Sequence, residues 1–310
     1  MLTPFEQTGT FSSIAAGEDF LEALAAAHSH VTLEKWGQPS GATLTRLGMF
    51  TVTVGTGPVD AVALGSIHGN EYSGREACMA FARDLAESTD PTMQAYLAEH
   101  SWSIMATANP AGNMLGTRDN ANSIDLNRTY DDFSEAETRS IRDWMEWAVP
   151  VLAVDLHEGT DGDFAADSAT GTMDPATGLA PLLPLGVDLS DTIKAALISA
   201  GRTSIAYGTI ADGTIRKSGH LHWQIVAQLV EMNYTRLTPA QRVAAHTLAL
   251  ETALDHHRTN AAWYDTAQRE AGGGRPIPPV FTGGPTIIRN GVPAPAAVSM
   301  IRDGAPVPVT

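Results

Sequence analysis

Apolar stretches of strand length alternate with helical patterns along the first 260 residues of this sequence. Short apolar or alternating runs predict strands over residues 42–47, 49–54, 59–67, 102–108 and 149–156. Helical spacing predicts helices over residues 19–29, 73–87, 134–147, 190–200 and 239–258. The segment 224–232 fits either a strand or a helix by its pattern alone. Strands that alternate with helices predict an α/β fold with helices on both faces of the sheet.

The last forty residues have a different character, rich in Pro and Gly after residue 272. They contain a short repeat, because Ile-Arg-Asn-Gly-Val-Pro-Ala-Pro at 288–295 recurs as Ile-Arg-Asp-Gly-Ala-Pro-Val-Pro at 301–308. Asn-Gly and Asp-Gly are typical of hairpin turns. We therefore divide the chain into a domain of residues 1–270 and a tail of residues 271–310. The tail is either a short β appendage, used for docking or oligomerisation, or a poorly ordered segment.

Composition and charge narrow the classes of function. Apolar residues make up 43% of the chain, which is enough for a substantial core, and the formal net charge is −16. A field of that sign repels nucleic-acid phosphates and anionic lipid, so we expect neither nucleic acid nor a membrane as partner. The single cysteine, Cys78, excludes an intrachain disulfide. No secretory signal and no apolar run of ~20 residues is visible, so we expect a cytoplasmic protein, with other export routes left open.

Polar side chains follow three of the predicted strands at the point where each ends. His68 and Glu71 come after 59–67, Asn109 comes after 102–108, and His157 comes after 149–156. Ligands bind at that edge of open α/β sheets. Two histidines and one carboxylate, with a fourth position left for water, are typical of a catalytic zinc site. His-x-x-Glu by itself is equally the sequence of an ordinary surface loop, so the surrounding motifs decide between the two interpretations.

Four motifs surround these residues in a fixed order. They are Gly-Ser-Ile-His-Gly-Asn-Glu-Tyr-Ser-Gly at 65–74, Asn-Pro-Ala-Gly at 109–112, Arg-Asp-Asn-Ala-Asn-Ser-Ile-Asp-Leu-Asn-Arg at 118–128 and Asp-Leu-His-Glu-Gly at 155–159. Over roughly residues 15 to 260 the sequence thereby resembles the zinc metallocarboxypeptidase family. Its motif sequences are similar to those of the branch that trims murein peptides and to those of the succinylglutamate desuccinylase and aspartoacylase branch. The resemblance implies a mixed, mostly parallel twisted sheet with helices on both faces.

The resemblance assigns metal ligands residue by residue. His68, Glu71 and His157 would bind one Zn²⁺ per chain. Asp125 would accept a hydrogen bond from the outer nitrogen of a ligand histidine, as carboxylates commonly do beside metal-bound imidazoles. The alternative for Asp125 is a residue that caps a turn.

The resemblance also assigns residues that would hold the substrate. Arg118 would polarise the scissile carbonyl and stabilise the oxyanion. Asn127 and Arg128 would bind a substrate carboxylate, the arginine through its bidentate fork. The digestive enzymes of the family carry a mobile Tyr three residues before a Ser-Gly pair, and Ile215 stands there in this sequence. We therefore expect the phenol of this mobile Tyr to be missing. Arg216 either binds an acidic or polar substrate in its place or belongs to a solvated loop.

Glu231 is the candidate general base. The family places a Glu on a late strand after a Ser-Gly and a Trp, and Glu231 follows Ser218, Gly219 and Trp223 in that order. Its neighbours are apolar, where a carboxylate is costly unless it has a partner or a function. Near a zinc-bound water it would accept a proton and return it to the leaving amine. Glu158, next to His157, is the rival candidate.

We therefore expect a zinc-dependent hydrolase that cleaves a peptide or amide bond beside a free carboxylate. A metallocarboxypeptidase acting on peptides, for example those of the cell wall, is the first hypothesis. The first alternative is an N-acyl amino-acid amidohydrolase of the desuccinylase or aspartoacylase type. The second is an inactive binding or assembly protein on the same scaffold, which need not retain a stoichiometric metal.

Overall fold

The computed structural model describes residues 1–41, 48–172, 178–207, 214 and 223–272, together with four short strands between residues 286 and 308. The helices are α1 (Pro4–Thr8), α2 (Ile14–Ala27), α3 (Tyr72–Ala86), α4 (Pro91–Glu99), α5 (Pro110–Leu115), η1 (Leu126–Arg128), α6 (Ala136–Ala148), α7 (Leu183–Ser199) and α9 (Pro239–Glu270). The strands of the main domain are β1 (Val31–Gly37), β2 (Met49–Gly55), β3 (Val59–Gly65), β4 (Ser101–Met105), β5 (Leu152–Gly159), β6 (Ser168–Gly171), β7 (Ser204–Ala206) and β8 (Val226–Asn233). Those of the tail are β9 (Thr286–Arg289), β10 (Val292–Pro295), β11 (Ser299–Arg302) and β12 (Ala305–Pro308).

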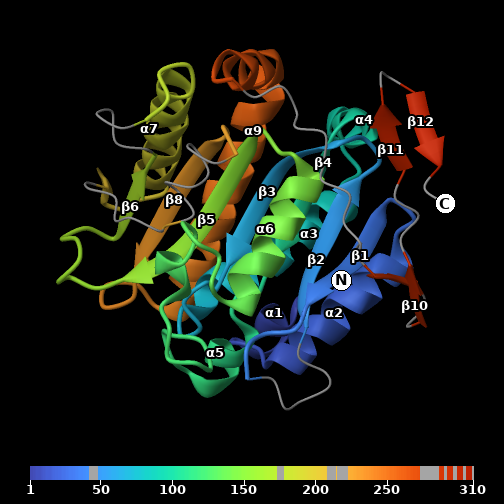
Figure 1. The fold of residues 1–310 in the computed structure, drawn as a ribbon. Coiled ribbons are helices and arrows are strands. Elements are labelled where there is room, and N and C mark those ends of the chain that lie inside the picture. Colours follow the sequence, from blue (N-terminus) through green and yellow to red (C-terminus); the bar gives the residue numbers. More distant parts are fainter. Residues whose placement is uncertain are drawn as a thin grey trace.

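One mixed sheet organises the molecule, with strand order β10-β9-β1-β2-β4-β3-β5-β8-β6-β7 (Figure 1). Its central pairs β4–β3, β3–β5 and β5–β8 are parallel, whereas β1–β2, β2–β4 and β6–β8 are antiparallel. The segment that fitted either a strand or a helix is the strand β8, which lies between β5 and β6. Because β3, β5 and β8 run in the same direction, the residues at their carboxyl ends meet at one edge of the sheet.

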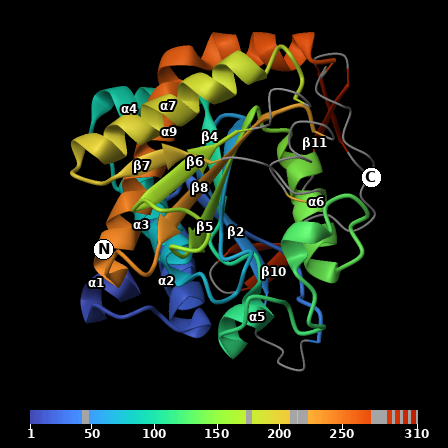
Figure 2. The same cartoon turned by 90° about the vertical axis from the view of Figure 1, so that its left-hand side faces the viewer.

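Helices cover both faces of the sheet (Figures 1 and 2). One apolar core joins α2, α3, α7 and α9 to the sheet, and a second core lies under α6, around Trp144. The strand β3 shows how the two cores share one element, because Ala61 and Ala63 contribute to the first core and Val62 and Leu64 to the second. A strand covered on both faces has a continuous apolar sequence. The predicted α/β fold with a mixed sheet is confirmed.

Several predicted boundaries differ from those observed. The closing helix α9 continues to Glu270, with non-helical backbone angles at Asn260, and β1, α1 and α4 were not predicted. The strand β1 escaped prediction because Glu34 and Lys35 interrupt its apolar pattern. Glu34 is nevertheless buried, since the hydroxyls of Thr51 and Thr53 donate to its carboxylate at 3.2 Å each. The predicted strand at 42–47 lies outside the described residues.

The tail contains two strand pairs, one for each copy of the repeat. The strand β9 pairs with β1 and β10, which extends the main sheet, and β11 pairs with β12 in a separate two-stranded sheet. The predicted β appendage is therefore present as strands, while its role in docking or oligomerisation and the domain boundary at residue 270 stay predictions. Among the described helices, none has the length and apolar character needed to cross a membrane.

A buried histidine on α9 lies far from the edge where β3 and β5 end. The Nδ1 atom of His257 lies 2.8 Å from the hydroxyl of Tyr96, and that hydroxyl accepts a hydrogen bond from Nε1 of Trp102 at 3.1 Å. Because an indole can only donate, the Tyr96 hydroxyl is left to donate to His257. Burial, reinforced by the charges of His100 and His256, lowers the pKa of His257 from 6.5 to about 4.

We expect His257 to make the fold sensitive to acid. The unfolded chain takes up this proton below pH 6.5, whereas the folded chain resists it until about pH 4. Stability should therefore be lost as the pH falls through this window, by about 3 kcal/mol. His257→Gln keeps an acceptor for Tyr96 but does not titrate, so its unfolding temperature, measured from pH 7.5 to 4 with a chelator present, should fall less steeply. Parallel pH curves for the two proteins would contradict this expectation.

Candidate metal centre and its cavity

The loop after β3 carries His68 and Glu71 to the edge of the sheet. Ser66 has a left-handed backbone (φ 53°), and its hydroxyl donates to the carbonyl of Glu71 at 2.7 Å, which closes the loop. Gly69 packs against the backbone of α5, where a Cβ would lie 2.1 Å from the carbonyl carbon of Gly112. The close approach of the two backbones therefore requires glycine between the histidine and the glutamate.

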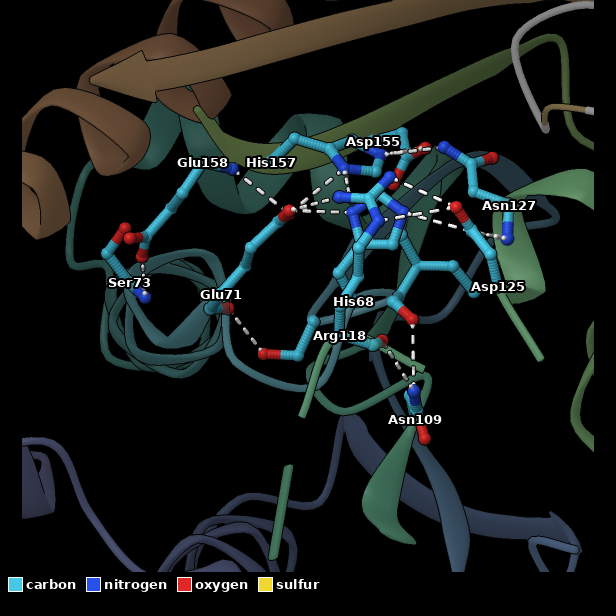
Figure 3. Close-up of polar contacts among 12 residues, drawn as sticks. His68, Glu71, Ser73, Asn109, Arg118, Asp125, Asn127, Asp155, His157 and Glu158 are labelled. Atoms are coloured by element: carbon cyan, nitrogen blue, oxygen red, sulfur yellow. Dashed lines mark hydrogen bonds and ion pairs between the residues drawn. The ribbon is translucent and has the colours of Figure 1, made fainter. Parts of the chain in front are cut away.

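His68, Glu71 and His157 converge as predicted, although they come from two distant segments (Figure 3). The Glu71 carboxylate lies 2.6 Å from Nδ1 of His68 through Oε1 and 3.0 Å from Nδ1 of His157 through Oε2. The two Nδ1 atoms are themselves 3.1 Å apart. All three side chains are buried, and one donor atom from each lies within 4.8 Å of the others.

The electrostatics of the cluster reflect two imidazoles around one carboxylate. Burial alone would raise the pKa of Glu71, but His68 and His157 outweigh it and lower that pKa well below its usual range. Burial alone would lower the pKa of each histidine, and the neighbouring carboxylates outweigh it and raise both values. The site therefore favours a carboxylate surrounded by positive charge, which is the environment that a bound cation would also provide.

Each histidine of the cluster has a second carboxylate on its outer nitrogen (Figure 3). Nε2 of His68 lies 3.3 Å from Oδ1 of Asp125, and Nε2 of His157 lies 2.8 Å from Oδ2 of Asp155. Such partners fix the ring and leave the inner nitrogen free to bind a metal. This role was predicted for Asp125 but not for Asp155. The available signal was the spacing Asp-Leu-His, because residues two apart on a strand share one face.

The three residues fit a metal of the zinc type. Two imidazole nitrogens and one carboxylate are a ligand set found in catalytic zinc sites, which keep a fourth position open. Both outer nitrogens are engaged, so each ring presents Nδ1 to the same point. Among the His, Cys, Asp and Glu side chains that the structure describes, those of His68, Glu71 and His157 have a geometry that could hold a metal ion.

The cluster opens into a cavity of about 200 Å³. Its lining includes residues predicted from the sequence: His68, Glu71, Arg118, Asn127, Arg128, His157, Glu158 and Glu231. Arg216, predicted to bind substrate, lies outside the described residues. The lining also includes Asp163 and Tyr207, for which no role in the site was predicted. Tyr207 therefore supplies a phenol to the cavity wall, although Ile215 stands where the digestive enzymes carry their mobile Tyr.

The two arginines of the cavity have different surroundings. Arg118 is half exposed, and its guanidinium lies 3.1 Å from Oδ2 of Asp125 and 3.4 Å from Oε1 of Glu71. It is therefore held directly beside the metal cluster. Arg128 is exposed, and its Nη1 donates to the carbonyl of Asn127 at 2.7 Å. Asn127 itself is buried, with its amide nitrogen 3.3 Å from Nε2 of His157, so it lies between the cluster and Arg128.

Glu231 reaches the cavity from the neighbouring strand. It is the register partner of His157 in the parallel pair β5–β8, and adjacent strands lie about 4.8 Å apart. Burial raises the pKa of Glu231 to about 7, partly offset by His157. Gly159 makes room for it, because a Cβ at that position would lie 2.6 Å from the ring of Phe164 and 3.0 Å from Oε2 of Glu231. The rival carboxylate, Glu158, instead accepts a hydrogen bond from the backbone nitrogen of Ser73 at 2.6 Å.

Comparison of the sequence with known proteins identifies carboxypeptidases. The family model described as zinc carboxypeptidase matches residues 18–164. Carboxypeptidase SOL1 of Arabidopsis thaliana is 30% identical over 108 residues, and human carboxypeptidase D is 29% identical over 116 residues. Each match covers 31% of this chain, and the chain spans only 22% and 8% of the length of these two relatives.

Solved structures of carboxypeptidases share the fold of this chain. The metallo-carboxypeptidase of Burkholderia cenocepacia has a TM-score of 0.66 at 18% identity, covering 80% of this chain and 70% of that chain. The metallo-carboxypeptidase of Pseudomonas aeruginosa has a TM-score of 0.63 at 16% identity, covering 82% and 70%. Carboxypeptidase A of Helicoverpa armigera has a TM-score of 0.62 at 16% identity, covering 82% and 75%. Over residues 18–164 the chain is similar to the zinc carboxypeptidase family, and it shares the fold of solved carboxypeptidases, so the predicted resemblance is confirmed.

Proposed function

We propose that this protein is a zinc-dependent carboxypeptidase that cleaves a peptide bond beside a free carboxylate. One observation carries the proposal: Arg118, Arg128 and the Glu231 carboxylate, whose pKa is raised by burial, line the same cavity as the cluster of candidate metal ligands. An arginine can bind a substrate carboxylate, and a carboxylate of raised pKa can accept a proton. A purely structural metal site needs neither group, since structural zinc sites are closed by protein ligands.

The residues of the cavity have separate roles in the proposed reaction. A zinc ion held by the three ligands would supply a Lewis acid and lower the pKa of water. Glu231 accepts the proton of the attacking water and delivers it to the leaving amine. Arg118 donates to the carbonyl oxygen as negative charge develops there. Arg128 holds the terminal carboxylate of the substrate, which sets the bond that is cleaved.

The lining of the cavity favours polar substrates. Nine of its residues are ionisable Asp, Glu, His or Arg side chains, whereas Leu229 and Tyr207 are the large apolar ones among the described residues. The relative from Pseudomonas aeruginosa was solved with (2-guanidinoethylmercapto)succinic acid, a ligand with carboxylic acid groups. Short peptides with charged groups, such as those of the bacterial cell wall, are therefore the substrates that we propose first.

A substrate panel tests this proposal. We expect zinc-dependent release of the last residue from peptides with a free carboxylate, loss of turnover on chelation and its return with zinc. Arg128→Ala should raise KM about 10- to 100-fold for free acids, the value of one charged hydrogen bond, and change little for the matched amides. Arg258→Ala, which removes a half-buried arginine that pairs with Asp255 and does not line the cavity, serves as the control. An equal effect of Arg128→Ala on acids and amides would contradict the carboxylate-binding role.

The same panel separates the two alternatives. An N-acyl amino-acid amidohydrolase would act on blocked amino acids and leave peptides intact. An inactive scaffold would turn over no member of the panel, and elemental analysis would show whether it retains one zinc per chain. The peptidase is preferred because the matched relatives are carboxypeptidases and because the candidate ligands, arginines and base are all present around one cavity.

A further inference from the structure

We propose that four buried residues form a polar bridge from α9 that positions the metal ligands Glu71 and His157. The bridge consists of Ser73 on α3, Glu158 on β5, and Arg242 and His246 on α9. All four side chains are buried. The inference rests on the proposed function only in taking Glu71 and His157 as metal ligands.

The first part of the bridge caps helix α3. Glu71 is the N-cap residue of α3, but its carboxylate points to the two histidines, and the helix has no cap from its own side chain. The first backbone nitrogens of a helix need an acceptor from elsewhere when they are buried. Glu158 supplies it, because its Oε1 accepts from the backbone nitrogen of Ser73 at 2.6 Å (Figure 3). Glu71 is thereby free to face the metal centre while the helix that carries it remains capped.

The second part joins α3 to the strand that carries His157. Nε2 of His246 lies 3.1 Å from the carbonyl oxygen of His157, and a carbonyl can only accept, so this nitrogen donates. Nδ1 of His246 is then the acceptor, and the hydroxyl of Ser73 donates to it across 3.2 Å. Both nitrogens of His246 are therefore used, one toward each of the two segments that supply metal ligands.

The third part compensates the charge of Glu158. Arg242 lies one helical turn before His246 on the same face of α9, and its Nη1 is 3.4 Å from Oε2 of Glu158. The rings of Phe11 and Tyr234 lie 5.6 and 6.0 Å from its guanidinium carbon. A buried carboxylate without such a partner would be strongly destabilising. Arg242 thus makes it possible for Glu158 to serve as the cap.

The bridge also contacts the metal ligand Glu71 directly. The backbone nitrogen of Glu158 donates to Oε2 of Glu71 at 3.0 Å, the same oxygen that lies 3.0 Å from Nδ1 of His157. The contacts therefore run in a ring from Glu71 through Glu158 and Ser73 to His246 and back to His157. Metal ligands must be held within a few tenths of an ångström, and the loss of outer partners typically weakens metal binding about 10- to 100-fold.

Zinc affinity, measured by competition with a chromophoric chelator on the full chain, tests the bridge. We expect His246→Leu to weaken zinc binding about 10- to 100-fold and His246→Gln, which can still donate to the carbonyl of His157, to restore part of it. The matched control is His257→Leu, which removes a second buried histidine from α9 whose partner is Tyr96. That variant should lose thermal stability and keep the zinc affinity of the wild type.

Ser73→Ala keeps the test decisive if His246→Leu fails to fold, since it removes only the hydroxyl that meets His246. It should weaken zinc binding in the wild type but add little in His246→Gln or His246→Leu, because the partner nitrogen is already gone. Wild-type affinity in folded His246→Leu or Ser73→Ala, or an equal loss in His257→Leu, would overturn the bridge. A wild type that binds zinc without peptidase activity would instead overturn the proposed function and leave the bridge standing.

Discussion

Glu231→Gln is expected to lower kcat by about 10²- to 10⁴-fold, the usual contribution of a general base, while zinc remains bound. The carboxylate stands beside His157 across the β5–β8 register but is not one of the three clustered donors. Glutamine has nearly the same shape, so it fills the space beside Gly159 without accepting a proton. Turnover of a free-acid peptide gives kcat, and elemental analysis gives the zinc content of the variant.

Glu34→Gln is the matched control for the loss of a buried carboxylate. Glu34 is also a strand glutamate whose pKa is raised by burial, but it lies on β1 among threonine hydroxyls and does not line the cavity. Its substitution should leave turnover unchanged. Normal activity in Glu231→Gln would refute the base assignment. Activity lost together with zinc would show that Glu231 acts on metal binding and not on proton transfer.

Arg118→Ala is expected to lower kcat by about 10²- to 10³-fold, which is typical of removing one donor to an oxyanion. The guanidinium is held against Asp125 at 3.1 Å and lies 3.4 Å from the Glu71 carboxylate, so it stands beside a candidate metal ligand, where we propose that the scissile carbonyl binds. Because the charge on that oxygen develops only in the transition state, KM should change little.

The comparison with Arg128→Ala makes this assignment testable. Arg118→Ala should act on kcat for acids and amides alike, whereas Arg128→Ala should act on KM for acids. Steady-state kinetics on matched acid and amide substrates separate the two patterns. A change in KM alone for Arg118→Ala would place that arginine with the ground-state binding groups.

Much of the site could be predicted because its signals are local. His68 and Glu71 are three residues apart, and the motif around Arg118 and Asp125 lies within eight residues. In each case the chain itself brings the side chains close. The prediction of Asp125 as a partner of a histidine agrees with its 3.3 Å contact to His68, although the roles of these residues in catalysis stay predictions.

The start of α6 and the role of Asp155 show where the predictions were incomplete. The helix predicted over residues 134–147 begins only after Glu135, and Glu137 in its first turn accepts hydrogen bonds from the backbone and hydroxyl of Ser40. At Glu137 the cause is a partner distant in the sequence. Asp155 was missed for another reason: its partner, His157, is only two residues away, but the orientation of that ring depends on the packing around it.

The sequence by itself determined the alternation of strands and helices, the ligand spacing and the resemblance to zinc carboxypeptidases, because these are properties of neighbouring residues and their periodicity. Only the tertiary structure decided that residues 226–233 form a strand beside β5, which puts Glu231 next to His157. It likewise decided that α9 brings His246 to the backbone of His157. Contacts between segments tens of residues apart depend on strand order, register and helix packing, and hydrophobic periodicity carries no information about which segment becomes the neighbour of which.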